Sequence, residues 1–293
     1  MSTSSSRQSV RKAVIPVAGF GTRFLPFTKA MPKEMLPIID TPVIQYVVEE
    51  AVASGITDII LVTSYAKRPV EDHFDTNSDL EAWLEKQGKE EQLEQVRKIS
   101  SMANFIYVRQ KGPYGNATPV ANVAHLVGDE PFAVMWGDEI FRGKRPRLRQ
   151  MMDVFETYGD PVLGLIPTDE EGTKKFGIID PAETIRPGLH RLNRVVEKPG
   201  PEKAPSRLAS IGSYILTPDI FEILKTLKSG HAGEYFLPDA IHELIQKRPV
   251  YGYELEGTWF DTGSKIGWLK ANIAMGLERE DLAPQVRAML QSL

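Results

Sequence analysis

Four apolar runs in the first half of the chain constrain its fold more than any other feature. They occupy residues 12–17 (KAVIPV), 58–64 (DIILVTS), 104–110 (NFIYVRQ) and 131–138 (PFAVMWGD). Runs of this length indicate strands, and runs that are apolar throughout indicate strands buried on both faces. Helical segments separate them, so the pattern predicts a parallel sheet with helices on both faces.

The segments between these runs carry helix signals. Thr41 predicts a helix N-cap, with Pro42 at the first helical position and an end at Gly55. Residues 78–99 are charged, with apolar residues at helical spacing, and predict a surface helix pair interrupted at Gly88. Shorter helices are predicted at residues 69–74 and 119–126.

The second half of the chain is more mixed. Shorter strand candidates alternate with three helix candidates at residues 218–228, 238–247 and 264–277. The strand candidates are residues 161–167, 176–180, 192–199, 210–217 and 250–257. The whole pattern predicts an α/β protein with a Rossmann-like, mostly parallel but mixed sheet.

Composition excludes several classes of function. The 293-residue chain has a net charge of −4, which argues against nucleic acid as its main partner. It has no cysteine, which excludes disulfides, thiolate zinc sites and cysteine nucleophiles. No run approaches 18 apolar residues, so no membrane span is expected. The Ser-rich residues 1–10 lack the apolar stretch of a signal peptide and predict a flexible tail, which favours a cytoplasmic enzyme.

A basic loop, AGFGTRFLPFTKAMPKEMLP (residues 18–37), directly follows the first predicted strand. Ligands of parallel sheets bind at the carboxyl ends of the strands, where this loop lies. Gly19 and Gly21 permit close backbone approach, and Arg23 and Lys33 suit phosphate oxygens. The P-loop motif is absent, and Phe24 stands where a dinucleotide fingerprint needs a third glycine. An ordinary surface loop with solvated cations is the alternative.

Several motifs together resemble the sugar-1-phosphate nucleotidyltransferases. They are the loop itself, VRQ, VGDEPFAV, VVEKP and DTGSKIGWLKA, and the resemblance covers residues 10–278. It implies a glycosyltransferase-A-like nucleotidyltransferase fold, with a catalytic domain over residues 11–278. That domain would comprise a nucleotide half (residues 11–140) and a sugar half (residues 141–265). Residues 279–293 would form a C-terminal helix suited to contacts in a homodimer or homotetramer.

The resemblance also implies a reaction. The helical insertion near residues 76–99 favours the uridylyl branch, which transfers a uridylyl group from UTP to α-D-glucose 1-phosphate. The products would be UDP-glucose and pyrophosphate. The attacking phosphate oxygen is already ionised at neutral pH, so catalysis needs positioning and charge neutralisation but no general base. Mg²⁺ is the implied cofactor.

Roles for single residues follow from the resemblance. The implied catalytic cations are Arg23, Lys33 and Lys198. The implied nucleotide-binding residues are Ala18, Gly19, Gly21, Gln110 and Gly115. The implied sugar-binding residues are Gly177, Glu197, Lys198 and Gly212. The implied metal ligands are Asp138 and Asp261. Taken singly, these residues also fit caps, turns, an exposed ion pair or strand irregularities.

Three features depart from the family pattern. Asn116 stands where the family has a histidine, and Trp136 replaces a typical Leu or Val. The spacing from Gln110 to Gly115 is two residues shorter than in some uridylyl enzymes and closer to that of thymidylyl enzymes. A glucose-1-phosphate thymidylyltransferase therefore stays open as an alternative, as does a non-catalytic module that binds sugar nucleotides.

Overall fold

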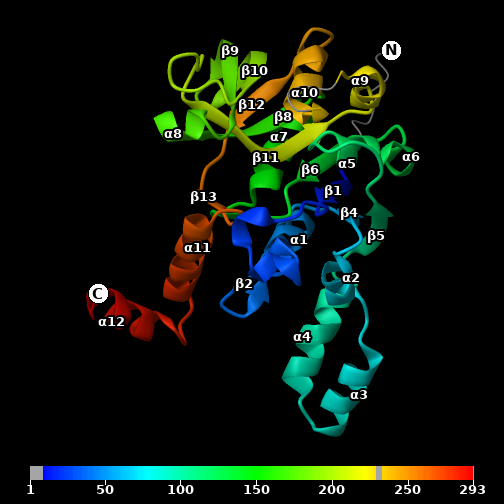
Figure 1. Ribbon diagram of the computed structural model, residues 1–293, viewed down its shortest axis with the longest axis vertical. Helices are drawn as coiled ribbons and strands as arrows, with labels where there is room; N and C mark the ends of the chain where they lie inside the picture. Colours follow the sequence, from blue (N-terminus) through cyan, green and yellow to red (C-terminus); the bar gives the residue numbers. More distant parts are fainter. Residues whose placement is uncertain (1–8, 229–232, 293) are drawn as a thin grey trace.

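A nine-stranded mixed sheet forms the centre of the computed structural model, which describes residues 9–228 and 233–292 (Figure 1). The strand order is β5-β4-β1-β6-β11-β8-β12-β10-β9. The four predicted apolar runs form four adjacent strands, all parallel to their neighbours within this group. They are β1 (Lys12–Pro16), β4 (Asp58–Thr63), β5 (Asn104–Arg109) and β6 (Phe132–Met135). The predicted parallel sheet is confirmed for this group.

The predicted sugar half, residues 141–265, supplies the other five strands, most of which pair antiparallel. They are β8 (Val162–Pro167), β9 (Gly177–Arg186), β10 (Leu189–Glu197), β11 (Leu208–Leu216) and β12 (Tyr251–Glu254). Only β12 and β8 run parallel here. β9 and β10 are longer than predicted, because they continue into one hairpin whose turn contains Gly188 at φ +77°.

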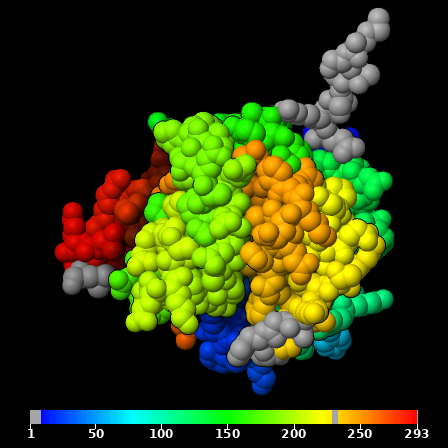
Figure 2. All heavy atoms as spheres, turned by 90° about the horizontal axis from the view of Figure 1, so that it is seen from above, coloured from blue at the N-terminus to red at the C-terminus, as the bar shows by residue number. Residues whose placement is uncertain are grey.

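Side-chain alternation along β1 divides the core between the two faces of the sheet. Ala13 and Ile15 face α1 (Val43–Ala53) and α7 (Arg147–Tyr158). Val14 faces the opposite layer, which contains α5 (Thr118–Ala121), α9 (Ile220–Thr226) and α10 (Leu237–Ile245). Seen from above in Figure 2, α10, in orange, lies between the β9–β10 hairpin and α9. Helices on both faces are thus confirmed.

Two short strand pairs lie outside the main sheet. β7 (Glu139–Arg142) pairs with β13 (Thr258–Asp261), so the chain just after β6 meets the chain just before α11 (Lys265–Glu278). β2 (Pro37–Ile38) pairs with β3 (Thr41–Pro42). The prediction of Thr41 as an N-cap is therefore wrong. Thr41 belongs to β3, and α1 begins at Val43 after Pro42 in an extended conformation.

Peripheral helices complete the fold. α3 (Ser78–Lys86) and α4 (Glu90–Ser101) form the predicted pair, broken at Gly88, and project away from the sheet beyond α2 (Arg68–Phe74) (Figure 1). The helix predicted at residues 119–126 is two short helices, α5 and α6 (Ala124–Val127). The last described helix is α12 (Ala283–Ser292).

The N-terminal tail predicted at residues 1–10 falls mostly on residues 1–8, which lie outside the described residues. Val10 is buried in the core cluster that contains Ala13 and Ile15. Within the described part of the chain, no helix combines the length and apolar character that a bilayer crossing requires.

Candidate active site

A cavity of about 1130 Å³ opens at the carboxyl edge of β1, β4, β5 and β6. The loop after β1 forms much of its wall, together with the loops that follow the other three strands. All five predicted nucleotide-binding residues line it: Ala18, Gly19, Gly21, Gln110 and Gly115. These residues belong to two loops that are far apart in sequence, and the parallel topology brings the loops together because the carboxyl ends of parallel strands meet at one edge.

Three 3₁₀ turns shape the loop after β1 and direct its cations into the cavity. They are η1 (Thr22–Phe24), η2 (Phe27–Lys29) and η3 (Lys33–Met35). Arg23 lies in the first turn, and its Nη1 donates to the Gly263 carbonyl at 3.4 Å. Lys33 opens the third turn, and both side chains line the cavity. Lys29, which the family pattern does not require, lines it as well.

Lys33 and Asp138 form a close ion pair within the cavity wall. The distance from Lys33 Nζ to Asp138 Oδ2 is 2.5 Å. Burial opposes the charge on Lys33, but attraction from Asp138 outweighs it and raises the pKa of the ammonium group. Burial likewise opposes the charge on Asp138, but Lys33 and Arg23 outweigh it and lower the pKa of the carboxyl group. Both groups are therefore charged at neutral pH.

The two predicted metal ligands converge beside Gly263. A Cβ built on Gly263 would lie 2.4 Å from Asp138 Oδ2 and 3.1 Å from Asp261 Oδ1, so the two oxygens are no farther apart than the sum of these distances. Burial, and then repulsion from Asp138, raise the pKa of Asp261. No cluster of three or more metal-ligating side chains occurs among residues 9–228 and 233–292. Two carboxylates fit Mg²⁺, which is commonly held by one or two carboxylates plus substrate phosphates.

A second ion pair lines the cavity and was not predicted from the sequence. Lys67 Nζ lies 2.7 Å from Glu34 Oε2, and the two side chains are only 5% and 1% exposed. Burial raises the pKa of Glu34 against the opposing attraction of Lys67. Glu34 Oε1 has no hydrogen-bond partner among the described residues. The only signal in the sequence was one acidic residue inside an otherwise basic loop.

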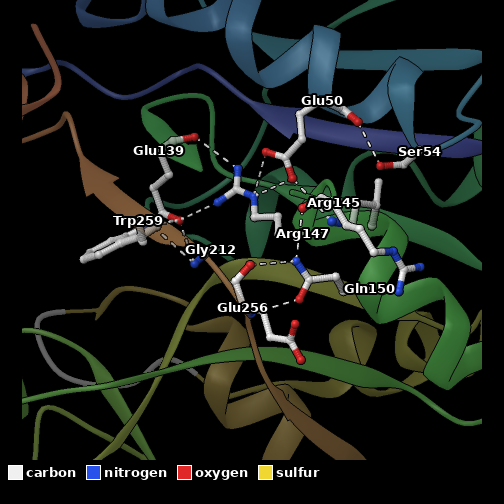
Figure 3. Close-up of polar contacts among 10 residues, drawn as sticks. Glu50, Ser54, Glu139, Arg145, Arg147, Gln150, Gly212, Glu256 and Trp259 are labelled. Atoms are coloured by element: carbon white, nitrogen blue, oxygen red, sulfur yellow. Dashed lines mark hydrogen bonds and ion pairs between the residues drawn. The ribbon is translucent and has the colours of Figure 1, made fainter. Parts of the chain in front are cut away.

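Next to Asp138 lies a buried polar network, also not predicted (Figure 3). Arg147 is fully buried between two carboxylates, with Nε 3.0 Å from Glu50 Oε2 and Nη1 3.3 Å from Glu139 Oε2. Glu139 Oε2 also accepts from Trp259 Nε1 at 3.0 Å and from the Gly212 N–H at 3.1 Å. Burial raises the pKa of Glu139 to about 7. The network joins α1, α7, β7, β11 and β13 directly next to Asp138.

The predicted sugar-binding residues lie apart from this cavity wall. Gly177 begins β9 and Glu197 ends β10, and the two are paired in the hairpin. Lys198 follows, with its Nζ 3.3 Å from Glu197 Oε1. None of these three lines the cavity, although Phe176, the residue before Gly177, does. Lys198 has φ +45°, a left-handed conformation that is uncommon for lysine and often marks a functional position.

Gly212 is covered by another side chain. It lies where the pairing of β11 with β8 is irregular, and its N–H donates a hydrogen bond to the Glu139 carboxylate. A Cβ on Gly212 would lie 1.7 Å from Cδ1 of Trp136, whose indole lines the cavity. In this conformation Trp136 stands between Gly212 and the cavity. A backbone contact from Gly212 to a sugar stays a prediction and requires Trp136 to move.

Comparison with known proteins identifies the family. The profile of the nucleotidyl transferase family matches residues 12–276. The chain belongs to this family. The UTP–glucose-1-phosphate uridylyltransferase YngB of Bacillus subtilis (strain 168) is 47% identical over 287 residues, which cover 98% of this chain and 96% of that protein. A UTP–glucose-1-phosphate uridylyltransferase of Staphylococcus saprophyticus is 45% identical and covers 97% of this chain and 99% of its own length.

Solved structures of nucleotidyl transferases have the same fold. A UTP-bound enzyme from Acinetobacter baumannii superposes with a TM-score of 0.89 at 35% identity, covering 97% of this chain and 99% of that one. A UDP-glucose pyrophosphorylase in complex with UDP-glucose superposes with a TM-score of 0.84 at 39% identity, covering 92% of this chain and 100% of that one. The predicted nucleotidyltransferase fold is therefore confirmed.

Proposed function

We propose that this chain transfers a uridylyl group from UTP to α-D-glucose 1-phosphate, releasing pyrophosphate and forming UDP-glucose. One observation carries the proposal: Arg23, Lys33, Asp138 and Asp261 converge in one cavity at the carboxyl edge of the sheet. Two relatives that match this chain over nearly their whole length are named UTP–glucose-1-phosphate uridylyltransferases.

The geometry suits in-line displacement at the α-phosphorus of UTP. Backbone at Ala18 and Gly19 would hold the base, with Gln110 lining the same cavity. Arg23 and Lys33 would neutralise the triphosphate and the charge that passes to pyrophosphate as it leaves. The attacking oxygen belongs to the sugar phosphate and needs no proton removed, so these cations act by charge stabilisation and positioning.

The metal proposal rests on Asp138 and Asp261. These carboxylates would hold Mg²⁺, which when bound orients the phosphates and stabilises their charge. Asp138 Oδ2 is paired with Lys33, so a contact of Lys33 with phosphate oxygens would replace or share this ion pair when metal and nucleotide bind. Lys33 and Asp138 thus form an ion pair before the substrates bind, and they would contact phosphate and metal afterwards.

The sugar phosphate is assigned to the residues at the β9–β10 junction. Lys198 is half-exposed beside Glu197, which leaves its ammonium group accessible to a phosphate. Glu197 has the acceptors that sugar hydroxyls require. We include both residues in the proposal, together with the backbone of Gly177.

The experiment is an initial-rate assay of pyrophosphate release with glucose 1-phosphate and MgCl₂, comparing UTP with dTTP. We expect turnover with UTP, its loss in excess EDTA, and a preference for UTP over dTTP of about 10- to 100-fold, since one methyl group is worth about 1–3 kcal/mol in a pocket. A preference for dTTP would make the chain a thymidylyltransferase. Binding of UDP-glucose without pyrophosphate release would make it a binding module.

We also propose self-association through the C-terminal helices, and a cytoplasmic location, where UTP is available. Exposed apolar side chains gather on α11 and α12, namely Ile266, Leu269, Met289 and Leu290. Light scattering across a range of protein concentrations, with Leu269→Glu as the disrupting variant, tests a dimer or tetramer.

A further inference from the structure

The loop after β5 is joined directly to the start of α10. The Tyr235 N–H donates to the Tyr114 carbonyl at 3.0 Å, and the Ala117 N–H donates to the Tyr235 carbonyl at 3.0 Å. Between these two bonds, Asn116 Oδ1 accepts from the Leu237 N–H at 2.6 Å. The three bonds form a bridge between residues 114–117 and residues 235–237.

Gly115 allows the two backbones of this bridge to approach closely. Its φ is +127°, and a Cβ there would lie 2.1 Å from the Tyr235 carbonyl oxygen. No side chain fits at that distance, so this close contact between the two segments requires glycine at position 115. Gly115 is also one of the predicted nucleotide-binding residues, and it lines the cavity together with Tyr114 and Asn116.

The far end of the bridge reaches the proposed sugar-phosphate residues. Leu237 is the first residue of α10, and its N–H is among those that a helix cannot satisfy internally. Pro238 follows, and its Cγ lies 3.9 Å from the position of a Cβ on Gly177. The same position is 3.3 Å from Glu197 Oε2. A continuous set of contacts therefore runs from the nucleotide loop, through Asn116 and α10, to Gly177 and Glu197.

We infer that Asn116 is a positioning residue that couples the two substrates. Bound nucleotide fixes the loop after β5, and Asn116 in that loop fixes the start of α10. α10 then keeps the sugar-phosphate residues in their binding arrangement. The inference rests on the proposed function, because it takes UTP and glucose 1-phosphate as the two ligands. Asn116 acts through α10, so its removal weakens the coupling between the ligands more than it weakens either ligand alone. By linkage, each ligand raises the affinity for the other by the same factor.

The test measures this factor without turnover. α,β-Methylene-UTP cannot release pyrophosphate, so the Kd of glucose 1-phosphate can be measured calorimetrically with and without it, in the presence of MgCl₂. For the unmodified protein we expect the Kd to fall about tenfold when the analogue is bound. For Asn116→Ala we expect a factor of about twofold or less. The reciprocal titration, with the analogue as titrant, must return the same factors.

Two variants control the experiment. Asn116→Asp keeps an oxygen acceptor at the start of α10 and should retain most of the coupling, even if its charge weakens binding of the analogue, because the factor is a ratio. Asn122→Ala is the matched control. Its Oδ1 accepts from the Lys111 N–H at 2.7 Å and its Nδ2 donates to the Lys111 carbonyl at 3.0 Å, so it anchors the same loop without any of the three bridge bonds. It should leave the factor unchanged.

The outcomes separate this inference from the proposed function. Coupling in Asn116→Ala equal to that of the unmodified protein, or absence of coupling in the unmodified protein, overturns the inference while UTP turnover stands. Failure of the unmodified protein to release pyrophosphate from UTP overturns the proposed function instead. If Asn116→Ala does not fold, as judged by circular dichroism, Asn116→Ser repeats the test, since its hydroxyl is too short to reach Leu237.

Discussion

The two halves of the molecule build their parts of the site in different ways. In the nucleotide half, four parallel strands end at one edge, and every residue predicted there lines a single cavity. In the sugar half, the strands are mostly antiparallel, and none of the predicted sugar-binding residues lines that cavity, although the predicted metal ligand Asp261 does. Gly177 and Glu197 meet only because the start of one strand pairs with the end of the next.

This difference shows in which kind of sheet the ends of the strands are enough to predict the position of a ligand site. Parallel strands collect their carboxyl ends at one edge, so their loops converge whatever the loop sequences are. In antiparallel neighbours the carboxyl ends lie at opposite edges, so these ends do not collect at a single edge of the sheet. The sugar half instead depends on particular contacts, such as those of Arg147, Trp136 and α10.

The largest effect is expected at the junction of the two halves. Arg147→Met leaves Glu50 and Glu139 buried without their partner, which should cost about 3–5 kcal/mol in the free energy of unfolding. Urea unfolding measures it. Arg149→Met is the matched control, because Arg149 lies on the same helix in a partly exposed ion pair with Asp153 and should cost about 1 kcal/mol or less. Equal losses would mean that the two halves do not depend on this network.

The second-largest effect is expected when Lys33, the cation paired with Asp138, is removed. Lys33→Met should lower kcat/KM by about 10²- to 10³-fold, as expected for a group that stabilises charge in the transition state. The thermal midpoint should change less than in Arg147→Met, because Asp138 lines an open cavity and its carboxylate, left without Lys33, is partly exposed to solvent. Initial rates and thermal melts measure the two quantities. A parallel loss of both would make Lys33 a structural residue.

A smaller effect tests whether Gly212 is free to contact a sugar. Gly212→Ala places a Cβ 1.7 Å from Trp136, and should lower the free energy of unfolding by about 1–3 kcal/mol. Trp136→Leu in the same chain should recover most of that loss, because it removes the clashing indole. Chemical denaturation of the two single variants and the double variant measures the coupling. Simple additivity would contradict the contact.

The smallest effect separates backbone strain from chemistry at Lys198. Lys198→Gly should raise the free energy of unfolding by about 1 kcal/mol, since glycine adopts φ +45° without the cost that lysine bears. The same change should raise the KM for glucose 1-phosphate about tenfold, because one phosphate contact is lost, with the KM for UTP unchanged. Steady-state kinetics with each substrate varied measures this. An equal change in both KM values would contradict a sugar-phosphate role.

The strand pattern and the loop after β1 were sufficient to predict much of the nucleotide half. Apolar runs specify buried strands, buried parallel strands specify the edge where ligands bind, and Arg23, Lys33 and Asp138 all follow strands that end there. The short helix boundaries were less predictable. Thr41 and Pro42 carried a capping signal, but pairing with β2 outweighed that local preference.

The buried polar residues were not predictable from sequence. Glu34, Lys67, Glu139 and Arg147 look like surface charges in a linear reading, since charged residues are rarely buried unless paired. Each has a partner far along the chain: Lys67 is 33 residues from Glu34, and Arg147 is 97 residues from Glu50. Glu139 is only 8 residues from Arg147, but it is 120 residues from Trp259. No local pattern reports such a pairing.

The sequence by itself determined the strands of the main sheet, which edge collects the ligands, and which cations and carboxylates are available there, because side-chain periodicity and turn chemistry are local properties. The tertiary structure alone decided which of those groups meet. It paired Lys33 with Asp138, buried Arg147 between two glutamates, covered Gly212 with Trp136 and joined Asn116 to α10. These contacts depend on distances between segments far apart in the chain, and those distances exist only once the sheet has formed.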